Sequence, residues 1–91
     1  MAQPVTTIHT TSDFRKAFLR VPKNIQEAAV KQDLLFRNNP FGANLKTHAL
    51  KDDLKGFHAY AVNKDYNISF RFLTPTEVIY YDIGTHSIYT P

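Results

Sequence analysis

The stretch GFHAYAVNKDYNISFRFLTPTEVIYYDIG, residues 56–84, decides the fold. Within it, apolar residues recur at every second position, which is the period of a β-strand with one buried face. Three such runs lie at residues 57–62, 66–73 and 77–83. The turn-forming segments 63–65 and 74–76 separate them, and connections this short join antiparallel neighbours. We therefore expect a three-stranded antiparallel meander.

The middle run shows which residues face the core. Alternation places Tyr66, Ile68, Phe70 and Phe72 on one side of the strand. It places Asn67, Ser69 and Arg71 on the other side. One face of the sheet is therefore expected to receive the rest of the fold, and the other to be polar and partly open.

Upstream of this stretch the apolar period changes to that of a helix. Thr11 or Ser12 can cap a first helix, whose apolar stripe is Phe14, Ala17, Phe18 and Val21. Pro22 suits the first turn of a second helix that ends near residues 38–40. Its apolar positions are Ile25, Ala28, Ala29, Leu35 and Phe36. Almost no loop separates the two helices, so they should form an αα-hairpin.

Residues 4–9 are β-branched and alternating, and they suit a first strand. The expected order is β-α-α-β-β-β, an α+β fold in which the first strand joins the meander beside a later strand. The helical hairpin should pack on one face of the sheet. Residues 1–91 have room for a single domain.

Composition narrows the function classes. The absence of cysteine excludes a disulfide scaffold, a thiolate zinc site and a cysteine nucleophile. The four histidines show no metal-binding spacing, so we expect no metal ion or other cofactor. No apolar run approaches the roughly 20 residues that span a bilayer, and no secretory signal begins the chain. We expect a cytoplasmic protein without a membrane partner.

The formal charge of +3 is modest, but its distribution is uneven. One stretch gathers Lys46, His48, Lys51, Lys55, His58 and Lys64. It holds only two acids, Asp52 and Asp53, before residue 65. Two interpretations stay open at this point: a solvated surface, or a patch that binds phosphate groups.

His48 and His86 are the strongest candidates for chemistry. Each is expected in an irregular polar segment, and Gly84 allows the chain to turn just before His86. A ribonuclease without metal needs two proton-transfer groups and cations that hold the phosphorane. The candidate cations are Lys46, Lys51, Lys55 and Arg71. Sequence spacing alone does not show that these residues converge. Tyr80 and Tyr81 are expected to pack within the sheet.

Several segments resemble the RelE/ParE toxin superfamily. They are Asn39-Pro40-Phe41, Leu45-Lys46-Thr47-His48-Ala49-Leu50-Lys51, Leu54-Lys55-Gly56-Phe57-His58-Ala59-Tyr60, Tyr66-Asn67-Ile68-Ser69-Phe70 and Asp82-Ile83-Gly84-Thr85-His86-Ser87-Ile88-Tyr89. The ending resembles most the RelE/YafQ-type mRNA interferases of type II toxin–antitoxin systems and related plasmid-stabilisation toxins.

The resemblance implies a ribosome-dependent endoribonuclease that cleaves mRNA and pairs with a cognate antitoxin. His86 matches the C-terminal catalytic histidine, a general acid. His48 matches the position of a base, and Asp65 matches an acid in the turn. The implied RNA contacts are Lys46, Lys51, Lys55, Asn67, Arg71 and Tyr89. The antitoxin could dock on the open sheet face, beside the helices or on a free edge strand.

Two positions depart from the family pattern. Many relatives carry an arginine where this chain has Asn67, and YafQ-like relatives carry a histidine where it has Ala61. Losing a charged contact to the transition state costs on the order of 10²–10³ in rate. Arg71 on the same face could compensate in part. The alternatives are therefore a weak or inactive homologue that only binds an antitoxin, and a ParE-like toxin directed at gyrase.

Overall fold

The computed structural model describes residues 3–85, and this part of the chain is an α+β domain. Its regular elements are β1 (Thr7–Thr10), α1 (Ser12–Arg20), α2 (Lys23–Asn38), β2 (His48–Ala49), β3 (His58–Ala61), β4 (Asn67–Thr74) and β5 (Glu77–Gly84), with the short 3-10 helices η1 (Ala43–Leu45) and η2 (Asp52–Leu54). No helix in the described range has the length and apolar character that crossing a membrane requires.

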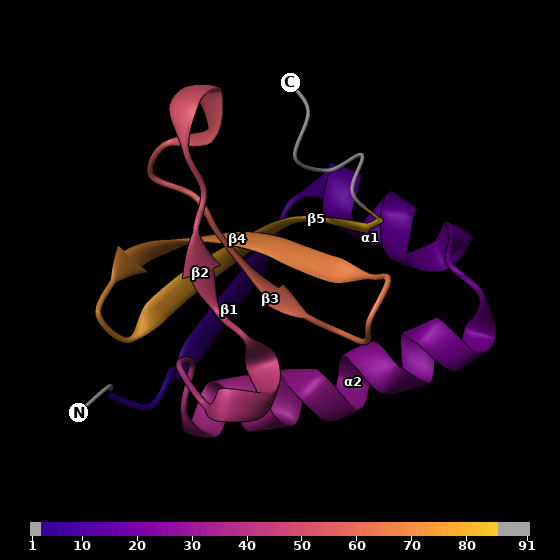
Figure 1. Ribbon diagram of the computed structural model, residues 1–91, viewed down its shortest axis with the longest axis horizontal. Helices are drawn as coiled ribbons and strands as arrows, with labels where there is room; N and C mark the ends of the chain where they lie inside the picture. Colours follow the sequence, from indigo (N-terminus) through magenta and orange to yellow (C-terminus); the bar gives the residue numbers. More distant parts are fainter. Residues whose placement is uncertain (1–2, 86–91) are drawn as a thin grey trace.

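The five strands form one sheet in the order β1-β5-β4-β3-β2 (Figure 1). Strands β3, β4 and β5 pair antiparallel, which confirms the meander. Strand β1 pairs parallel with β5, so the first strand does join a later one. The sequence did not predict β2, a two-residue strand that pairs antiparallel with β3 and forms the other edge of the sheet.

The first strand begins later than the expected residues 4–9. The backbone N–H of Val5 donates to the carbonyl of Arg37 at the end of α2, at 2.8 Å, and the Val5 side chain is buried. Residues before Thr7 therefore anchor the chain to the helix, and only from Thr7 onward does it pair along β5.

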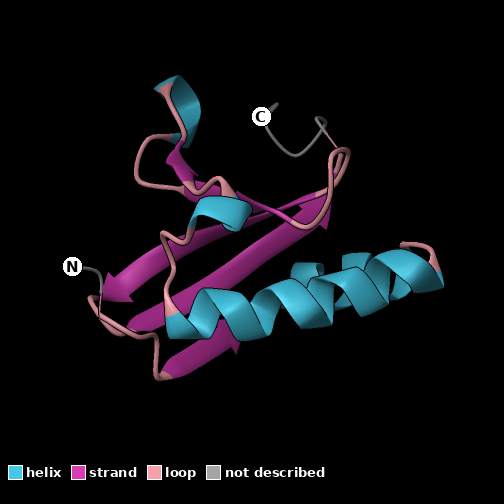
Figure 2. Cartoon of the chain, turned by 60° about the horizontal axis from the view of Figure 1, so that its bottom comes forward, coloured by secondary structure: helices cyan, strands magenta, loops and turns pink. Residues whose placement is uncertain are grey.

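Both helices cover the same face of the sheet (Figure 2). Helix α1 begins at the predicted cap, because the Thr11 hydroxyl accepts from the N–H of Phe14 at 3.0 Å. Helix α2 inserts Phe36, which has no solvent exposure, among the rings of the sheet. Its ring centroid lies 4.6 Å from that of Tyr60 and 4.8 Å from that of Phe70. This aromatic cluster fixes α2 against β3 and β4.

A hydrogen-bonded chain crosses the same interface. The hydroxyl of Tyr60 donates to that of Tyr80 at 3.0 Å, and Tyr80 donates to the Asp33 carboxylate at 2.6 Å. Arg37, one turn further along α2, holds the other Asp33 oxygen at 2.9 Å. Burial raises the pKa of both tyrosines, so they stay protonated and act as donors.

Candidate functional site

The sheet face turned away from the helices has a row of small side chains. His48 is paired with Ala59, Ala59 with Ser69, and Ser69 with Asp82 across four strands. Directly paired residues project from the same side of a sheet. His48 therefore projects from the edge of this face, beside two small residues that are almost fully buried.

His48 differs from the expectation in its local structure. It was predicted in an irregular segment, but it lies on strand β2. Its Nδ1 is 2.9 Å from the carbonyl oxygen of Lys46. Since a carbonyl can only accept, the bond requires a proton on Nδ1, and the neutral ring then carries its basic lone pair on Nε2. Strand pairing and this bond together orient an exposed imidazole that can accept a proton.

A groove of about 680 Å³ lies where β3 and β4 turn beside α2. Its polar lining includes Lys31, Asn44, Lys46, His48, Lys64 and Asn67. Ala61 also lines it and is paired directly with Asn67. The structure thus gathers three of the predicted site residues, Lys46, His48 and Asn67, in one concave surface. No acidic residue of the described chain lines this groove.

Other predicted residues lie elsewhere. Lys51 and Lys55 flank η2 in the arm between β2 and β3, which projects away from α2 (Figure 1). Asp65 is exposed in the β3–β4 turn, next to the groove but not in its lining. His86 and Tyr89 lie outside the described residues.

Arg71 lies on the predicted face but not in the groove. Its guanidinium carbon is 5.6 Å from the centroid of the Phe57 ring, a cation–π distance. Phe57 in turn packs edge-on against Tyr81, with centroids 4.9 Å apart. Tyr81 therefore packs within the sheet as expected, and Tyr80 is buried in the core. Compensation for the missing arginine by Arg71 would require its side chain to leave this ring.

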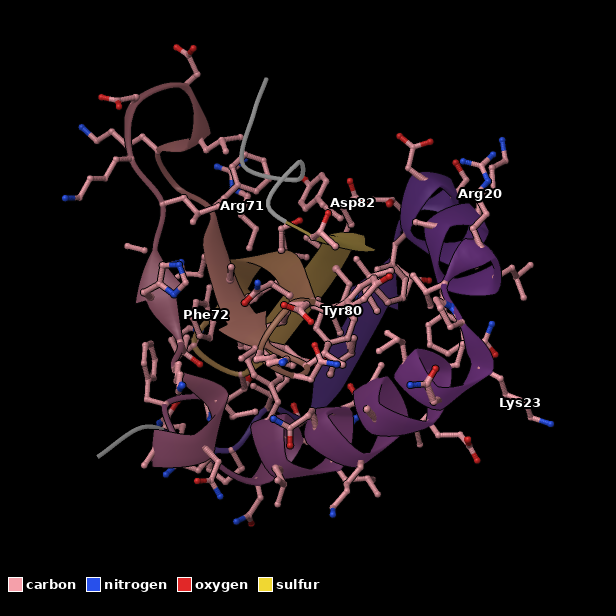
Figure 3. All side chains as sticks on the ribbon, turned by 45° about the vertical axis from the view of Figure 1, so that its right-hand side comes forward. Arg20, Lys23, Arg71, Phe72, Tyr80 and Asp82 are labelled. Atoms are coloured by element: carbon pink, nitrogen blue, oxygen red, sulfur yellow. The ribbon has the colours of Figure 1, made fainter. Side chains whose placement is uncertain are left out.

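A β-bulge in β5 changes which of its residues face away from the helices. Ser69 pairs with Asp82, but its neighbour Phe70 pairs with Tyr80, so Tyr81 is the extra residue. Tyr80 and Ile83 both reach the core, and Asp82 turns to the opposite face together with Arg71 (Figure 3). Strict alternation would have put Asp82 in the core. Nothing in a single-strand pattern marks this shift.

Strand β5 ends next to residues that line the groove. Gly84, its last residue, is paired with Asn67. Asn67 is paired on its other side with Ala61. The described chain therefore leaves the sheet beside two residues that line the groove, immediately before the segment that carries His86.

His58 occupies a separate, aromatic environment at the edge of the core. Its ring stacks on Phe70, with centroids 5.6 Å apart, and meets the edges of Phe72 and Phe41. Its buried Nδ1 has no hydrogen-bond partner in the described chain. Burial lowers the pKa of His58, and the nearby charge of His48 lowers it further. His58 is thus a packing residue whose protonated form is disfavoured.

Sequence reasoning missed Lys31 as part of the site and treated Lys64 only as one of several basic residues. Lys31 lies on α2, and its place in the groove depends on how that helix crosses the sheet. Gln32 is part of that crossing, because its side-chain amide donates to the carbonyl of Ala61 at 2.9 Å. No group of three His, Asp or Glu side chains within residues 3–85 is arranged to hold a metal ion.

Comparisons with known proteins identify the fold. No protein-family model matches the chain, and neither does any curated protein sequence. Among solved structures, a YoeB/ParE toxin from Agrobacterium tumefaciens matches with a TM-score of 0.74 at 14% identity, covering 89% of this chain and 99% of that one. The RelBE2 toxin–antitoxin complex from Mycobacterium tuberculosis gives 0.74 at 19% identity, covering 92% and 100%.

The DinJ-YafQ toxin–antitoxin complex from E. coli gives a TM-score of 0.73 at 22% identity, covering 92% of this chain and 96% of that one. Over most of its length, the chain therefore has the fold that these YoeB/ParE, RelBE2 and YafQ toxin structures share.

Proposed function

We propose that the chain is a toxin of a type II toxin–antitoxin system, an endoribonuclease that cleaves mRNA on the ribosome. The observation that carries the proposal is the position of His48. Its imidazole is oriented by the Lys46 carbonyl and lines a groove that is rich in lysine and free of acids within the described chain. Proteins with this fold include the YafQ and RelE toxins.

The chemistry follows from these groups. Nε2 of His48 takes the proton of a ribose 2′-hydroxyl, and that oxygen attacks the adjacent phosphorus. Lys46 and the amide of Asn67 stabilise the negative charge of the phosphorane. The bond to the 5′-oxygen then breaks, and His86 donates a proton to that oxygen. The products are a 2′,3′-cyclic phosphate and a free 5′-hydroxyl, and no metal ion or other cofactor takes part.

The remaining family positions have supporting roles in this proposal. Asp65 in the β3–β4 turn would orient a neighbouring donor, and Tyr89 would stack on a base. Lys51 and Lys55 on the projecting arm would contact RNA of the ribosome or message. Because Asn67 brings no charge to the phosphate, we expect slower cleavage than in relatives with an arginine there.

The test is cleavage of mRNA in a translating extract. His48→Ala should lower the rate on the order of 10²–10⁴, since it removes the proton acceptor. His86→Ala should have a similar effect. His9→Gln is a matched control, because His9 lies on β1 at the opposite edge of the sheet and is paired with Glu77. Intact mRNA at high excess of the wild-type protein would refute the nuclease, and inhibition of gyrase supercoiling would favour the ParE-like alternative.

An antitoxin is the proposed partner, which would place the pair in the cytoplasm with the ribosomes. A groove of about 210 Å³ between α1, α2 and β1 is lined mainly by apolar side chains. Val30 at its border is 55% exposed, and Leu34, one turn further along α2, is 64% exposed. Co-expression of a small protein encoded next to the toxin should restore growth, and Leu34→Glu should weaken that rescue. Unchanged rescue would place the antitoxin on another surface.

A further inference from the structure

Three lysines line the groove beside α2, and the proposed cleavage step uses only one of them, Lys46. Lys31 enters it from α2, Lys46 from the end of η1, and Lys64 from the β3–β4 turn. Within residues 3–85 none of these three lysines forms an ion pair. Three like charges facing one concave surface repel one another, and an anion in the groove would relieve that repulsion.

The amide side chains around the lysines also favour an anion. The Oδ1 of Asn63 accepts from the backbone N–H groups of Asp65 and Tyr66, at 2.9 and 2.8 Å. These bonds occupy the oxygen and leave the NH₂ group of Asn63, which can only donate, for a ligand. Asn44 and Asn67 add amides that can read either a phosphate oxygen or the edge of a base.

The size of the groove has a structural origin. Ala61 and Asn67 are directly paired, and both line the groove. The side chain of Ala61 ends at its β-carbon and, like that of its pair partner Asn67, projects from the sheet face turned away from the helices, so this part of the groove stays open. The volume of about 680 Å³ lies within the range of roughly 300–1,000 Å³ typical of binding sites for small ligands.

We propose that this groove binds the phosphate backbone of single-stranded RNA, with Lys31 and Lys64 as the phosphate contacts next to the His48 site. The inference rests on the proposed function for the identity of the polyanion and adds where its strand lies. Single-stranded RNA is favoured over a duplex because the amides of Asn44 and Asn67 can reach base edges only where these are unpaired. In this chain α2 and the turn thus supply the positive charge that Asn67 does not.

The test uses a short RNA with 2′-O-methyl groups, which lacks the nucleophile and cannot be cut. Binding to the full chain is followed by fluorescence anisotropy at several salt concentrations. The double variant Lys31→Gln/Lys64→Gln should bind roughly tenfold more weakly and lower the salt slope by about 1 for each lysine. The matched control Lys16→Gln/Lys23→Gln removes the same charge from exposed positions on α1 and the start of α2.

A charge-neutral variant gives a second, independent arm. Ala61→Leu narrows the groove next to Asn67 and should also weaken binding at least tenfold, with a melting temperature that shows the fold intact. In the wild type, backbone amide signals of Ala61, Lys64 and Asn67 should shift on titration with the RNA. Equal losses in the groove and control variants, binding unaffected by Ala61→Leu, or equal binding of duplex RNA would each overturn the proposal.

RNA binding by the groove and cleavage of mRNA can be measured separately. If the wild-type protein binds the methylated RNA through the groove but leaves mRNA intact, the binding proposal stands and the nuclease proposal is refuted. If the protein cuts mRNA but binds RNA equally well without Lys31 and Lys64, the nuclease proposal stands and the RNA-binding role of this groove is refuted. Absence of any RNA binding at low salt would refute the inference directly.

Discussion

The two faces of the sheet are built from opposite kinds of side chain. The helix-covered face carries the large rings of Tyr60, Phe70 and Tyr80 around Phe36, all without exposure or nearly so. The other face has Ala59 and Ser69 at its centre and polar residues toward its edges. Large rings fix the orientation of α2, whereas the centre of the opposite face is formed by two small residues that are themselves buried.

The difference shows how one short sheet can serve both stability and binding. Packing on the helix side determines where Lys31 and Gln32 of α2 stand relative to β3. The groove at the end of the sheet is therefore built by contacts made on the face that a ligand does not touch. Substitutions on the two faces should accordingly affect different measurements.

The largest effect is expected at Phe36. Phe36→Ala removes a side chain without exposure and leaves a cavity among three aromatic rings, which costs about 3–5 kcal/mol of the free energy of unfolding. Urea unfolding measures it. Arg71→Gln removes only an exposed cation–π contact with Phe57 and should cost less than about 1 kcal/mol. Similar losses for both variants would break the comparison between the faces.

A smaller effect is expected for the buried hydroxyl chain. Tyr80→Phe leaves the Tyr60 hydroxyl and one oxygen of Asp33 without their present partner, at a cost of about 1–3 kcal/mol. Tyr81→Phe is the matched control, because the Tyr81 ring packs on Phe57 outside this chain of hydrogen bonds. If the two variants unfold at the same urea concentration, the hydrogen-bonded chain contributes nothing to stability.

The smallest effect is a pH dependence at His58, which lies between the core and the edge. Its pKa in the folded chain is lowered from the ordinary value near 6.5, so the unfolded chain binds a proton more readily. The free energy of unfolding should therefore decrease as the pH falls below about 6.5. His58→Phe should flatten this dependence in urea unfolding measured between about pH 5 and 7.5. A slope identical to wild type would assign the effect to other groups.

Much of the fold followed from local pattern. The alternation in residues 66–73 and the period of the apolar residues on both helices predicted most of the buried positions, and Thr11 was identified as a cap. Leu35, expected on the buried stripe of α2, is instead 44% exposed. The short strand β2 was missed, because two residues contain no repeat to detect. The bulge at Tyr81 was missed for a related reason: it depends on the pairing of two strands and leaves no mark in either one alone.

The candidate site was predicted less completely. His48, Lys46 and Asn67 were selected from the sequence and do line one groove. Lys51, Lys55 and Arg71 were selected with them but lie apart from it. The roles of His86 and Tyr89 stay predictions, because both residues lie outside the described range.

The sequence by itself determined the order of the elements, the core faces and the types of side chain available for chemistry, because period and composition are local properties of a chain. Only the tertiary structure decided which of those side chains meet. Lys31 on α2 and Lys64 in a turn share a groove because the rings packed between α2 and the sheet fix the crossing of the helix. Such an encounter depends on packing between distant segments, and no local pattern encodes it.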